Sequence, residues 1–234
     1  MFQEKSAPPS HMVIGGALVA ENYSFTAANA PQLRAYHDLI RTTYEPLGFL
    51  NDHADAFMPR DGTQCYVLCY LDEVVGSCSL TPVQDEQSVF NRFIPGQTGE
   101  QRARMIELNN IILVPELRGG IGLSLILYHA TLRAMEDGAE LVVGITRYQT
   151  LRHFVEAGAI PVNHEPLHLL GREDLHDFVI YYDVRSPDAL TYLRERARRL
   201  FGQALTLKDI KVQVAARERG VRVQQHPSAN AQAA

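Results

Sequence analysis

The segment Glu107–Gly122, which reads ELNNIILVPELRGGIG, decides the fold of this chain. Its first half belongs to Ile106–Val114, an apolar run of the kind that forms a strand. It ends with three glycines in four positions, where a helix predicted over Gly120–Asp137 begins. Leu141–Ile145 follows as a continuous apolar run, which is typical of a strand covered on both faces. A strand, a long helix and a second strand in this order predict a parallel crossover.

The residues before this segment predict a helix followed by a β-hairpin. A strand over Tyr23–Ala27 precedes a helix over Pro31–Tyr44, whose apolar side chains recur at helical spacing. Gln64–Tyr70 and Val74–Thr81 are β-prone runs joined by a short turn, which is the signature of a hairpin. We expect Pro82–Gln101 to be a long polar connection.

The residues after the crossover predict a short helix over Thr150–Ala157 and a last strand over Phe178–Val184. Taken together, the segments predict an α/β fold. Its mixed, mostly antiparallel sheet contains one parallel strand pair and is flanked by helices. We expect this domain to occupy residues 12–186.

A second helix signal marks a basic C-terminal extension. Ser186-Pro187-Asp188 combines a capping hydroxyl, a proline suited to the first turn and an acid at the positive end of the helix. We expect a helical extension over residues 187–223. Its arginine-rich face is either solvated or a contact for an acidic carrier protein, CoA phosphates or nucleic acid. Residues 1–11 and 224–234 are expected to be flexible termini.

Charge and composition argue against several classes of protein. The 234 residues include 22 Lys and Arg and 27 Asp and Glu, a net charge of −5, although residues 187–234 alone hold 9 basic and 4 acidic residues. The negative balance disfavours a nucleic-acid binder. No stretch approaches the roughly 20 apolar residues that cross a bilayer. A poor secretory signal and three cysteines interpreted as reduced thiols favour a cytoplasmic protein.

The glycine-rich turn is a candidate anion site. Glycines let the backbone approach a ligand, and the N–H groups at the start of a helix attract phosphate. Arg118 adds a fixed positive charge beside them. The alternative is a tight turn whose glycines serve packing only, and the sequence leaves both readings open. His164 and His168 lack a third ligand at suitable spacing, so we expect no metal site.

The turn resembles the acyl-CoA-binding motif of the GCN5-related N-acyltransferase (GNAT) superfamily. Gly120 and Gly122 match its two glycines, whereas Leu117 stands where Gln or Arg is usual and Arg118 follows one place later. Leu151–Ala159 resembles the helix that follows in the family. The resemblance implies an acyl-CoA or acetyl-CoA donor and no metal. It assigns the pantetheine arm to Leu113 and Val114, and the phosphates to Arg118, Gly119, Gly120, Ile121, Gly122 and Leu123.

A finer resemblance is to the autoinducer synthases and N-acyl amino acid synthases. It is carried by Leu39–Phe49, Val74–Pro82 and Glu107–Leu113, although Ser79 and Asn110 stand where arginine is usual. It implies transfer to a small, amino-acid-like amine. A long-chain N-acyl amino acid or homoserine lactone synthase is an alternative reading, and an acyl-carrier protein is an alternative donor.

Glu107 is the predicted catalytic residue, because amide formation needs a base for the excess proton of the amine. The alternatives are an exposed carboxylate at the strand end and a structural salt bridge. Alternation along the strand predicts that Glu107, Asn109, Ile111 and Leu113 share one face. Asn109 and Asn110 are predicted either to orient the substrate or to make structural hydrogen bonds.

Arg41 and Phe154 complete the predicted substrate contacts. The resemblance implies that Arg41 shapes the acceptor pocket, and a solvated arginine is the alternative. Phe154 stands where many relatives have a tyrosine that protonates the leaving thiolate. A thiol pKa near 8.5 makes the thiolate a fair leaving group, so the chemistry does not require that tyrosine, and Tyr148 and His153 are candidate substitutes. The alternative from another class is a catalytically inactive acyl-CoA-binding sensor or scaffold, in which Ser79, Asn110 and Phe154 reflect lost activity.

Overall fold

The computed structural model describes residues 23–50, 59–84, 87–95, 97, 103–118, 121–186, 191 and 193. In chain order its helices and strands are β1 (Tyr23–Ala27), α2 (Ala30–Tyr44), η2 (Glu45–Leu47), β2 (Gln64–Tyr70), β3 (Glu73–Pro82), α4 (Val89–Phe93), β4 (Met105–Leu113), η3 (Pro115–Leu117), α5 (Ile121–Glu136), β5 (Leu141–Arg147), α6 (Tyr148–Val155), β6 (Ile160–Pro161) and β7 (Asp177–Asp183). The predicted strands are confirmed, as are the helices predicted over 31–44, 120–137 and 150–157, with ends that shift by a residue or two.

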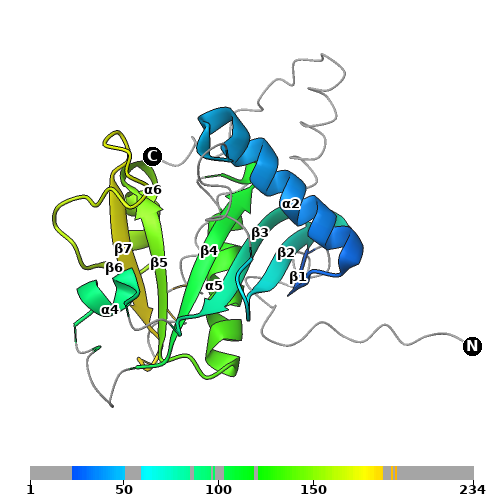
Figure 1. The fold of residues 1–234 in the computed structure, drawn as a ribbon. Coiled ribbons are helices and arrows are strands. Elements are labelled where there is room, and N and C mark those ends of the chain that lie inside the picture. Colours follow the sequence, from blue (N-terminus) through cyan, green and yellow to red (C-terminus); the bar gives the residue numbers. More distant parts are fainter. Residues whose placement is uncertain are drawn as a thin grey trace, which may run out of the picture.

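Seven strands within the described ranges form one sheet, in the order β1-β2-β3-β4-β5-β7-β6. Neighbouring strands are antiparallel except β4 and β5, which run parallel. This confirms the predicted mixed sheet with one parallel crossover. The two parallel strands pair only from Met105–Leu141 to Glu107–Val143. Beyond this point they separate toward their carboxyl ends, as Figure 1 shows, and we call this region the β4–β5 divergence.

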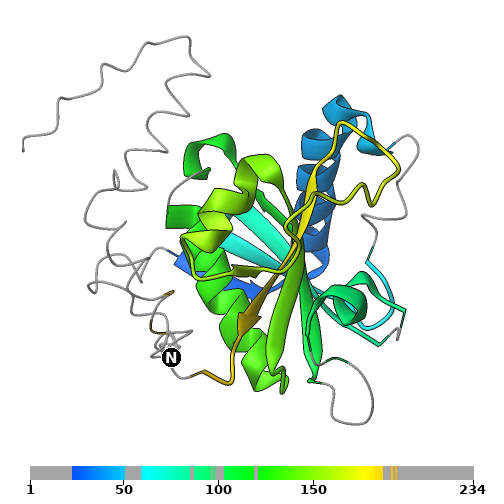
Figure 2. The ribbon, with the colours of Figure 1, turned by 90° about the vertical axis from the view of Figure 1, so that its left-hand side faces the viewer.

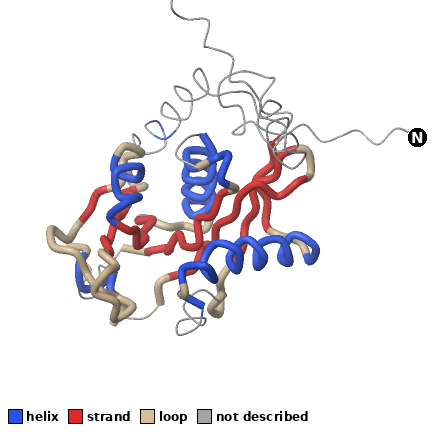
Figure 3. The backbone as a smooth tube through the Cα atoms, turned by 90° about the horizontal axis from the view of Figure 1, so that it is seen from above, coloured by secondary structure: helices blue, strands red, loops and turns tan. Residues whose placement is uncertain are grey.

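Helices cover both faces of the sheet. Figures 2 and 3 show α5 and α6 on one face and α2 and α4 on the other. The main core cluster lies under α5, where Ile126 and Leu127 are fully buried. On the opposite face, one smaller cluster includes Tyr36 of α2 and Val67, and another includes Phe90 of α4 and Val143.

Local sequence signals explain where α2 begins and how the hairpin turns. The Asn29 side chain accepts a hydrogen bond from the Gln32 N–H at 3.1 Å, and the Gln32 side chain accepts one from the Asn29 N–H at 3.0 Å. This reciprocal capping box fixes the first turn of α2. Leu71 and Asp72 have φ angles of 47° and 70°, the pair of positive values that a two-residue hairpin turn requires.

The predicted polar connection over Pro82–Gln101 contains a short helix, α4, which the sequence analysis did not predict. The Ser88 hydroxyl accepts a hydrogen bond from the Asn91 N–H at 3.4 Å and so caps this helix, and Phe90 is buried beneath it. Five residues are too few to show helical periodicity in a sequence, which is why the helix was missed. The strand β6 has only two residues, which is too few to show the alternation of a strand, and it was also missed.

The described part of the predicted C-terminal extension is Thr191 and Leu193. Leu193 is fully buried and belongs to the main core cluster. Each residue of 122–131 in α5 is buried, so the side of this helix that faces away from the sheet is covered as well as the side that faces it. The burial of Leu193 agrees with this. The rest of residues 187–223, both predicted termini and residues 12–22 lie outside the described residues, so the domain boundaries stay a prediction.

Candidate active site

A β-bulge interrupts β4 just beyond the start of the β4–β5 divergence. Asn110 and Ile111 both lie opposite Cys78 of β3, so β4 has one residue more than its partner there. Asn110 adopts a φ of 50°, in the left-handed region that asparagine enters more readily than most residues. A bulge of this kind reverses the inside–outside alternation of the strand that follows it.

The predicted faces of β4 are therefore right before the bulge and wrong after it. The alternation predicts Ile111 and Leu113 on the face of Glu107, whereas both pack with the main core cluster under α5. Ile112 packs under α2 instead. The bulge thus places both asparagines of β4 on the face of Glu107, which α2 covers.

The two asparagines differ in what they can contact. Asn110 is buried, and its side-chain amide donates to the Tyr36 hydroxyl of α2 at 3.2 Å. Asn109 is half-buried, and its side-chain oxygen accepts from the Asn110 N–H at 3.0 Å. Asn110 therefore fastens α2 to the sheet, which is the structural alternative, and Asn109 is the more accessible of the two predicted substrate contacts.

Glu107 occupies the last position at which β4 pairs with β5, opposite Val143. Its side chain is 8% exposed and forms an ion pair with Arg60, whose side chain is 60% exposed. Burial raises the pKa of Glu107 above its ordinary value, and the Arg60 guanidinium opposes part of that rise. Glu107 is therefore not an exposed strand-end carboxylate. A carboxylate of raised pKa where the strands part suits a general base that works near neutral pH.

Arg60 is the site residue that the sequence analysis missed. It lies 47 residues from Glu107 along the chain, and no motif or spacing connects the two. The sheet brings them together: Thr63, just after Arg60, donates its N–H to the Arg60 carbonyl at 2.9 Å, and its hydroxyl hydrogen-bonds the Thr81 hydroxyl at 2.8 Å. Thr81 pairs directly with Glu107 in the sheet.

The turn predicted to bind the donor's phosphates is described only in part. Gly119–Gly120 lie outside the described residues, as does the side chain of Ile121. A Cβ on Gly122 would lie 2.8 Å from Leu113 Cδ2 and 2.9 Å from Leu117 Cβ. The packing of α5 against the preceding turn therefore requires this glycine, as the packing alternative expects.

Arg118 lies beside this turn with an exposed side chain. Its Nε donates to the Leu113 carbonyl at 3.0 Å, while the Val114 N–H donates to a carbonyl of β3 at 3.0 Å. These groups of the predicted pantetheine contacts already have partners within the chain. Leu123, another predicted donor contact, packs in the main core. By contrast, the edge of β4 that faces β5 has no paired strand beyond Glu107 in the described part of the chain.

Two predicted substrate contacts lie away from Glu107. Phe154 packs against the main core cluster on the opposite face of the sheet, and its carbonyl accepts from the Tyr182 hydroxyl at 3.5 Å. Arg41 lies on the exposed side of α2, where it pairs with Asp38 at 2.9 Å. Tyr148, a predicted substitute proton donor, is 64% exposed at the start of α6.

Further along the β4–β5 divergence, β5 presents an apolar and a cationic side chain on the face of Glu107. Strand alternation places Ile145 and Arg147 on the same face as Val143, the neighbour of Glu107 in the sheet. Ile145 is 39% exposed. The Arg147 and Arg172 guanidinium groups lie 5.2 Å and 5.1 Å from the centre of the Phe49 ring, forming a group that bounds this face.

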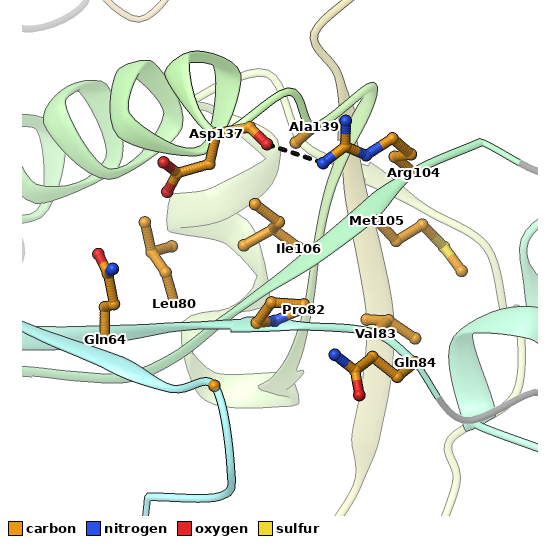
Figure 4. Close-up of a pocket in the computed structure, with 11 residues that line it drawn as sticks. Gln64, Leu80, Pro82, Val83, Gln84, Arg104, Met105, Ile106, Asp137 and Ala139 are labelled. Atoms are coloured by element: carbon orange, nitrogen blue, oxygen red, sulfur yellow. Dashed lines mark hydrogen bonds between the residues drawn. The ribbon is translucent and has the colours of Figure 1, made fainter.

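A cavity of about 360 Å³ lies elsewhere, at the far end of α5 (Figure 4). Its lining includes Leu80, Ile106, Asp137 and Ala139. Arg104, also in the lining, donates to the Asp137 carbonyl at 3.0 Å. The 16 residues of α5 separate its two ends by about 24 Å, so this cavity is not at the predicted phosphate-binding turn.

Solved structures share this arrangement of strands and helices. FeeM, an N-acyl amino acid synthase from uncultured soil microbes, matches with a TM-score of 0.59 at 14% identity, over 74% of this chain and 97% of its own. TofI, solved in a ternary complex with an inhibitor and MTA, matches at 0.53 and 19% identity, over 74% and 96%. BjaI, a CoA-dependent acyl-homoserine lactone synthase solved with MTA, matches at 0.51 and 16%, over 75% and 89%.

The chain has a GNAT-like fold. This confirms the fold that the sequence resemblance implies, including its likeness to the autoinducer-synthase branch. No protein-family model and no curated protein matches the sequence. The GNAT-like fold is therefore recognised through its sheet and its β4–β5 divergence and not through close sequence identity.

Within the described residues, no helix has the length and apolar character that crossing a membrane requires. No three side chains among their His, Cys, Asp and Glu residues gather as metal ligands would.

Proposed function

We propose that the protein is a GNAT-type N-acyltransferase. It transfers an acyl group, acetyl or longer, from acyl-CoA to the amine of a small acceptor, including amino-acid-like amines. The observation that carries this proposal is the position of Glu107, a buried carboxylate of raised pKa at the point where β4 and β5 part. A charged group that is costly to bury is expected where chemistry needs it.

The reaction that fits this position is direct attack without an enzyme nucleophile. The amine nitrogen donates its lone pair to the thioester carbonyl carbon, a C–N bond forms, and the C–S bond then breaks. Glu107 accepts the excess proton of the amine, and the sulfur leaves as the thiolate of CoA and is protonated to the thiol. A thiol pKa near 8.5 makes the thiolate a fair leaving group, so Phe154 in place of a tyrosine does not prevent the reaction.

The donor is proposed to lie along the unpaired edge of β4, with its phosphates at the start of α5 beside Arg118. A main-chain edge without a strand partner offers hydrogen bonds to the amides of pantetheine, and an exposed arginine suits phosphate. The names of the similar structures support an acyl-CoA donor: FeeM is an N-acyl amino acid synthase and BjaI a CoA-dependent acyl-homoserine lactone synthase. An acyl-carrier protein remains the alternative donor.

The second candidate is an inactive acyl-CoA-binding sensor or scaffold. It is favoured by Phe154 and by Ser79 and Asn110, which stand where the resembling branch has arginines. The structure gives one of these departures another explanation, because Asn110 anchors α2 through Tyr36 and its φ of 50° suits asparagine. An inactive protein would also have no use for the buried charge of Glu107.

The deciding experiment is mass spectrometry of the full-length protein incubated with mixed acyl-CoAs and a panel of amines. A new amide that forms with the wild type and is lost with Glu107→Gln supports the transferase. A wild type that binds acyl-CoA in calorimetry but forms no amide supports the sensor. Glu136→Gln is the matched control, since this exposed carboxylate pairs with Arg133 on α5 and should not affect either reading.

A further inference from the structure

The Arg60–Glu107 ion pair is unequal. Glu107 is fixed in a central strand and is 8% exposed, whereas Arg60 comes from the turn before β2 and is 60% exposed. Among the described residues, Arg60 is the charged group that opposes the rise in the pKa of Glu107. One partner is thus rigid and desolvated. The other is a long side chain at the surface with five N–H donors.

Deprotonation by Glu107 requires the acceptor to enter this pair. An ammonium group must come within hydrogen-bond distance of the carboxylate before its proton can be taken. Arg60 already contacts one of the two carboxylate oxygens. The arriving ammonium replaces the positive charge that Arg60 provides, so Arg60 can turn away from Glu107 while staying beside the acceptor.

The other two arginines on this face do not become available in the same way. Arg147 pairs with the buried Asp177 at 2.7 Å, and Arg172 pairs with Asp174 at 2.6 Å. Each keeps its own carboxylate when the acceptor binds. Arg60 alone of these three arginines shares its carboxylate with the acceptor's amine, and its planar guanidinium is suited to a second, bidentate carboxylate.

We propose that Arg60 is a specificity-determining residue that binds a carboxylate of the acceptor next to the amine that Glu107 deprotonates. The inference rests on the proposed acyl transfer and narrows its acceptor to molecules that have an amine and a carboxylate a few bonds apart. Without the acceptor, Arg60 pairs with Glu107. With the acceptor bound, its ammonium pairs with Glu107 and its carboxylate pairs with Arg60, so every charge has an opposite charge beside it in both states.

Matched acceptors test the carboxylate directly. Leucine and 3-methylbutylamine differ only by it, as do phenylalanine and 2-phenylethylamine. Each is assayed with the full-length wild type, Arg60→Gln and Arg60→Lys, and with the control Arg133→Gln, whose arginine pairs with Glu136 near the far end of α5. Thermal unfolding of each variant confirms that it folds.

We expect the wild type to prefer the amino acid in at least one pair. Arg60→Gln should raise KM for that amino acid about 10- to 100-fold, as loss of a charge-assisted contact does. Arg60→Lys should retain part of the preference because it keeps the charge, and Arg133→Gln should not change it. The decisive quantity is the ratio of kcat/KM for the amino acid to kcat/KM for its matched amine. Any effect of Arg60 on Glu107 itself changes both values by the same factor and leaves this ratio unchanged.

Four results would overturn this inference or its basis. Equal loss of activity toward both members of a pair would mean that Arg60 acts only through Glu107. A wild type that acylates the amines as well as the amino acids has no carboxylate preference to explain. Absence of any amide, from these acceptors and from the wider amine panel, contradicts the proposed transferase itself, whereas activity confined to amines without a carboxylate contradicts only the role of Arg60.

Discussion

The two faces of β3 and β4 differ in the polarity of the side chains that they bury. On the face under α5, the two strands present apolar side chains that pack in the main core: Val75, Cys78, Leu80, Ile106 and Leu108. On the face under α2, the same strands bury polar side chains: Ser77, Ser79, Thr81, Glu107 and Asn110. Burying polar groups costs free energy unless they are hydrogen-bonded. The face under α2 therefore gives up stability that the face under α5 supplies.

The buried polar side chains on the face under α2 differ in how many hydrogen-bond or ion-pair partners they have. Thr81 bonds the Thr63 hydroxyl, and Asn110 bonds Tyr36, so both serve the architecture as well. Among the described residues, the exposed Arg60 is the cation paired with Glu107, and the Ser77 hydroxyl has no hydrogen-bond partner. A face that holds an under-compensated carboxylate between well-packed clusters agrees with the acceptor site proposed above, and the following predictions test this contrast.

Glu107→Gln should show the contrast most strongly. Loss of the general base should lower kcat/KM about 10²- to 10⁴-fold. The same change should raise the free energy of unfolding at neutral pH by about 1 kcal/mol, because a neutral amide costs less to bury than a carboxylate and leaves only an exposed Arg60 behind. Initial rates and urea denaturation measure the two quantities. A variant that loses both activity and stability would make Glu107 a structural residue.

Leu80→Ala is the corresponding change on the apolar face. Leu80 is 3% exposed and lies between Ser79 and Thr81 in sequence, with its side chain on the other side of the sheet. Truncation should cost about 2–5 kcal/mol of unfolding free energy, from lost burial and the space left behind. Urea denaturation measures it. At temperatures where the variant is folded, KM for both substrates should stay within about two-fold, and a large selective rise in KM would show that the faces are not separate.

Asn110 tests whether the bulge holds the polar face in place. Asn110→Gly keeps access to a φ of 50° but loses the bond to Tyr36, whereas Asn110→Ala loses both. We expect Ala to be the less stable variant by about 1 kcal/mol, the cost of forcing a Cβ into the left-handed region. Chemical denaturation of the two variants side by side gives the difference. Equal stabilities would mean that the strand relaxes into a regular ladder.

These residues also mark how far the sequence reaches. Apolar, β-prone runs predicted each long strand, and the order strand, helix, strand predicted the crossover, because both are read from local spacing. Glu107 stood out as a carboxylate in an apolar strand. The bulge beside it did not, although two adjacent asparagines are a signal for a left-handed residue. Arg60 carried no signal, since its contact with Glu107 depends on the register of β3 with β4 and on a turn whose path the sequence does not encode locally.

The pH dependence of catalysis should report the environment of Glu107. Because burial raises the pKa of Glu107, kcat/KM should rise with pH along an acid limb that lies above the ordinary glutamate range. Arg60→Gln should move this limb to higher pH, since it removes the cation that opposes the rise. An acid limb at the ordinary value, or one that moves downward in the variant, would contradict this assignment.

The same shift gives a sign for stability. A carboxyl group whose pKa is higher in the folded than in the unfolded state binds more protons when folded, so stability falls as pH rises from the unfolded toward the folded value. The free energy of unfolding of Glu107→Gln minus that of the wild type should therefore grow with pH over that window and then level off. Urea denaturation across an acidic-to-neutral series measures the difference, and a flat difference would place Glu107 in a solvated environment.

Ser77→Ala should give the smallest change and the most informative sign. Ser77 is fully buried on the α2 face, where it pairs with Val67 and Ile112, and its hydroxyl has no hydrogen-bond partner within the described part of the chain. Removing an unpaired buried hydroxyl should raise the free energy of unfolding by up to about 1 kcal/mol. Ser79→Ala is the control, because the Ser79 hydroxyl donates to the Asn109 carbonyl at 3.4 Å and its loss should destabilise. If Ser77→Ala also destabilises the protein, the Ser77 hydroxyl has a hydrogen-bond partner in the folded state. The buried polar groups on the α2 face would then cost less stability than the contrast between the two faces supposes.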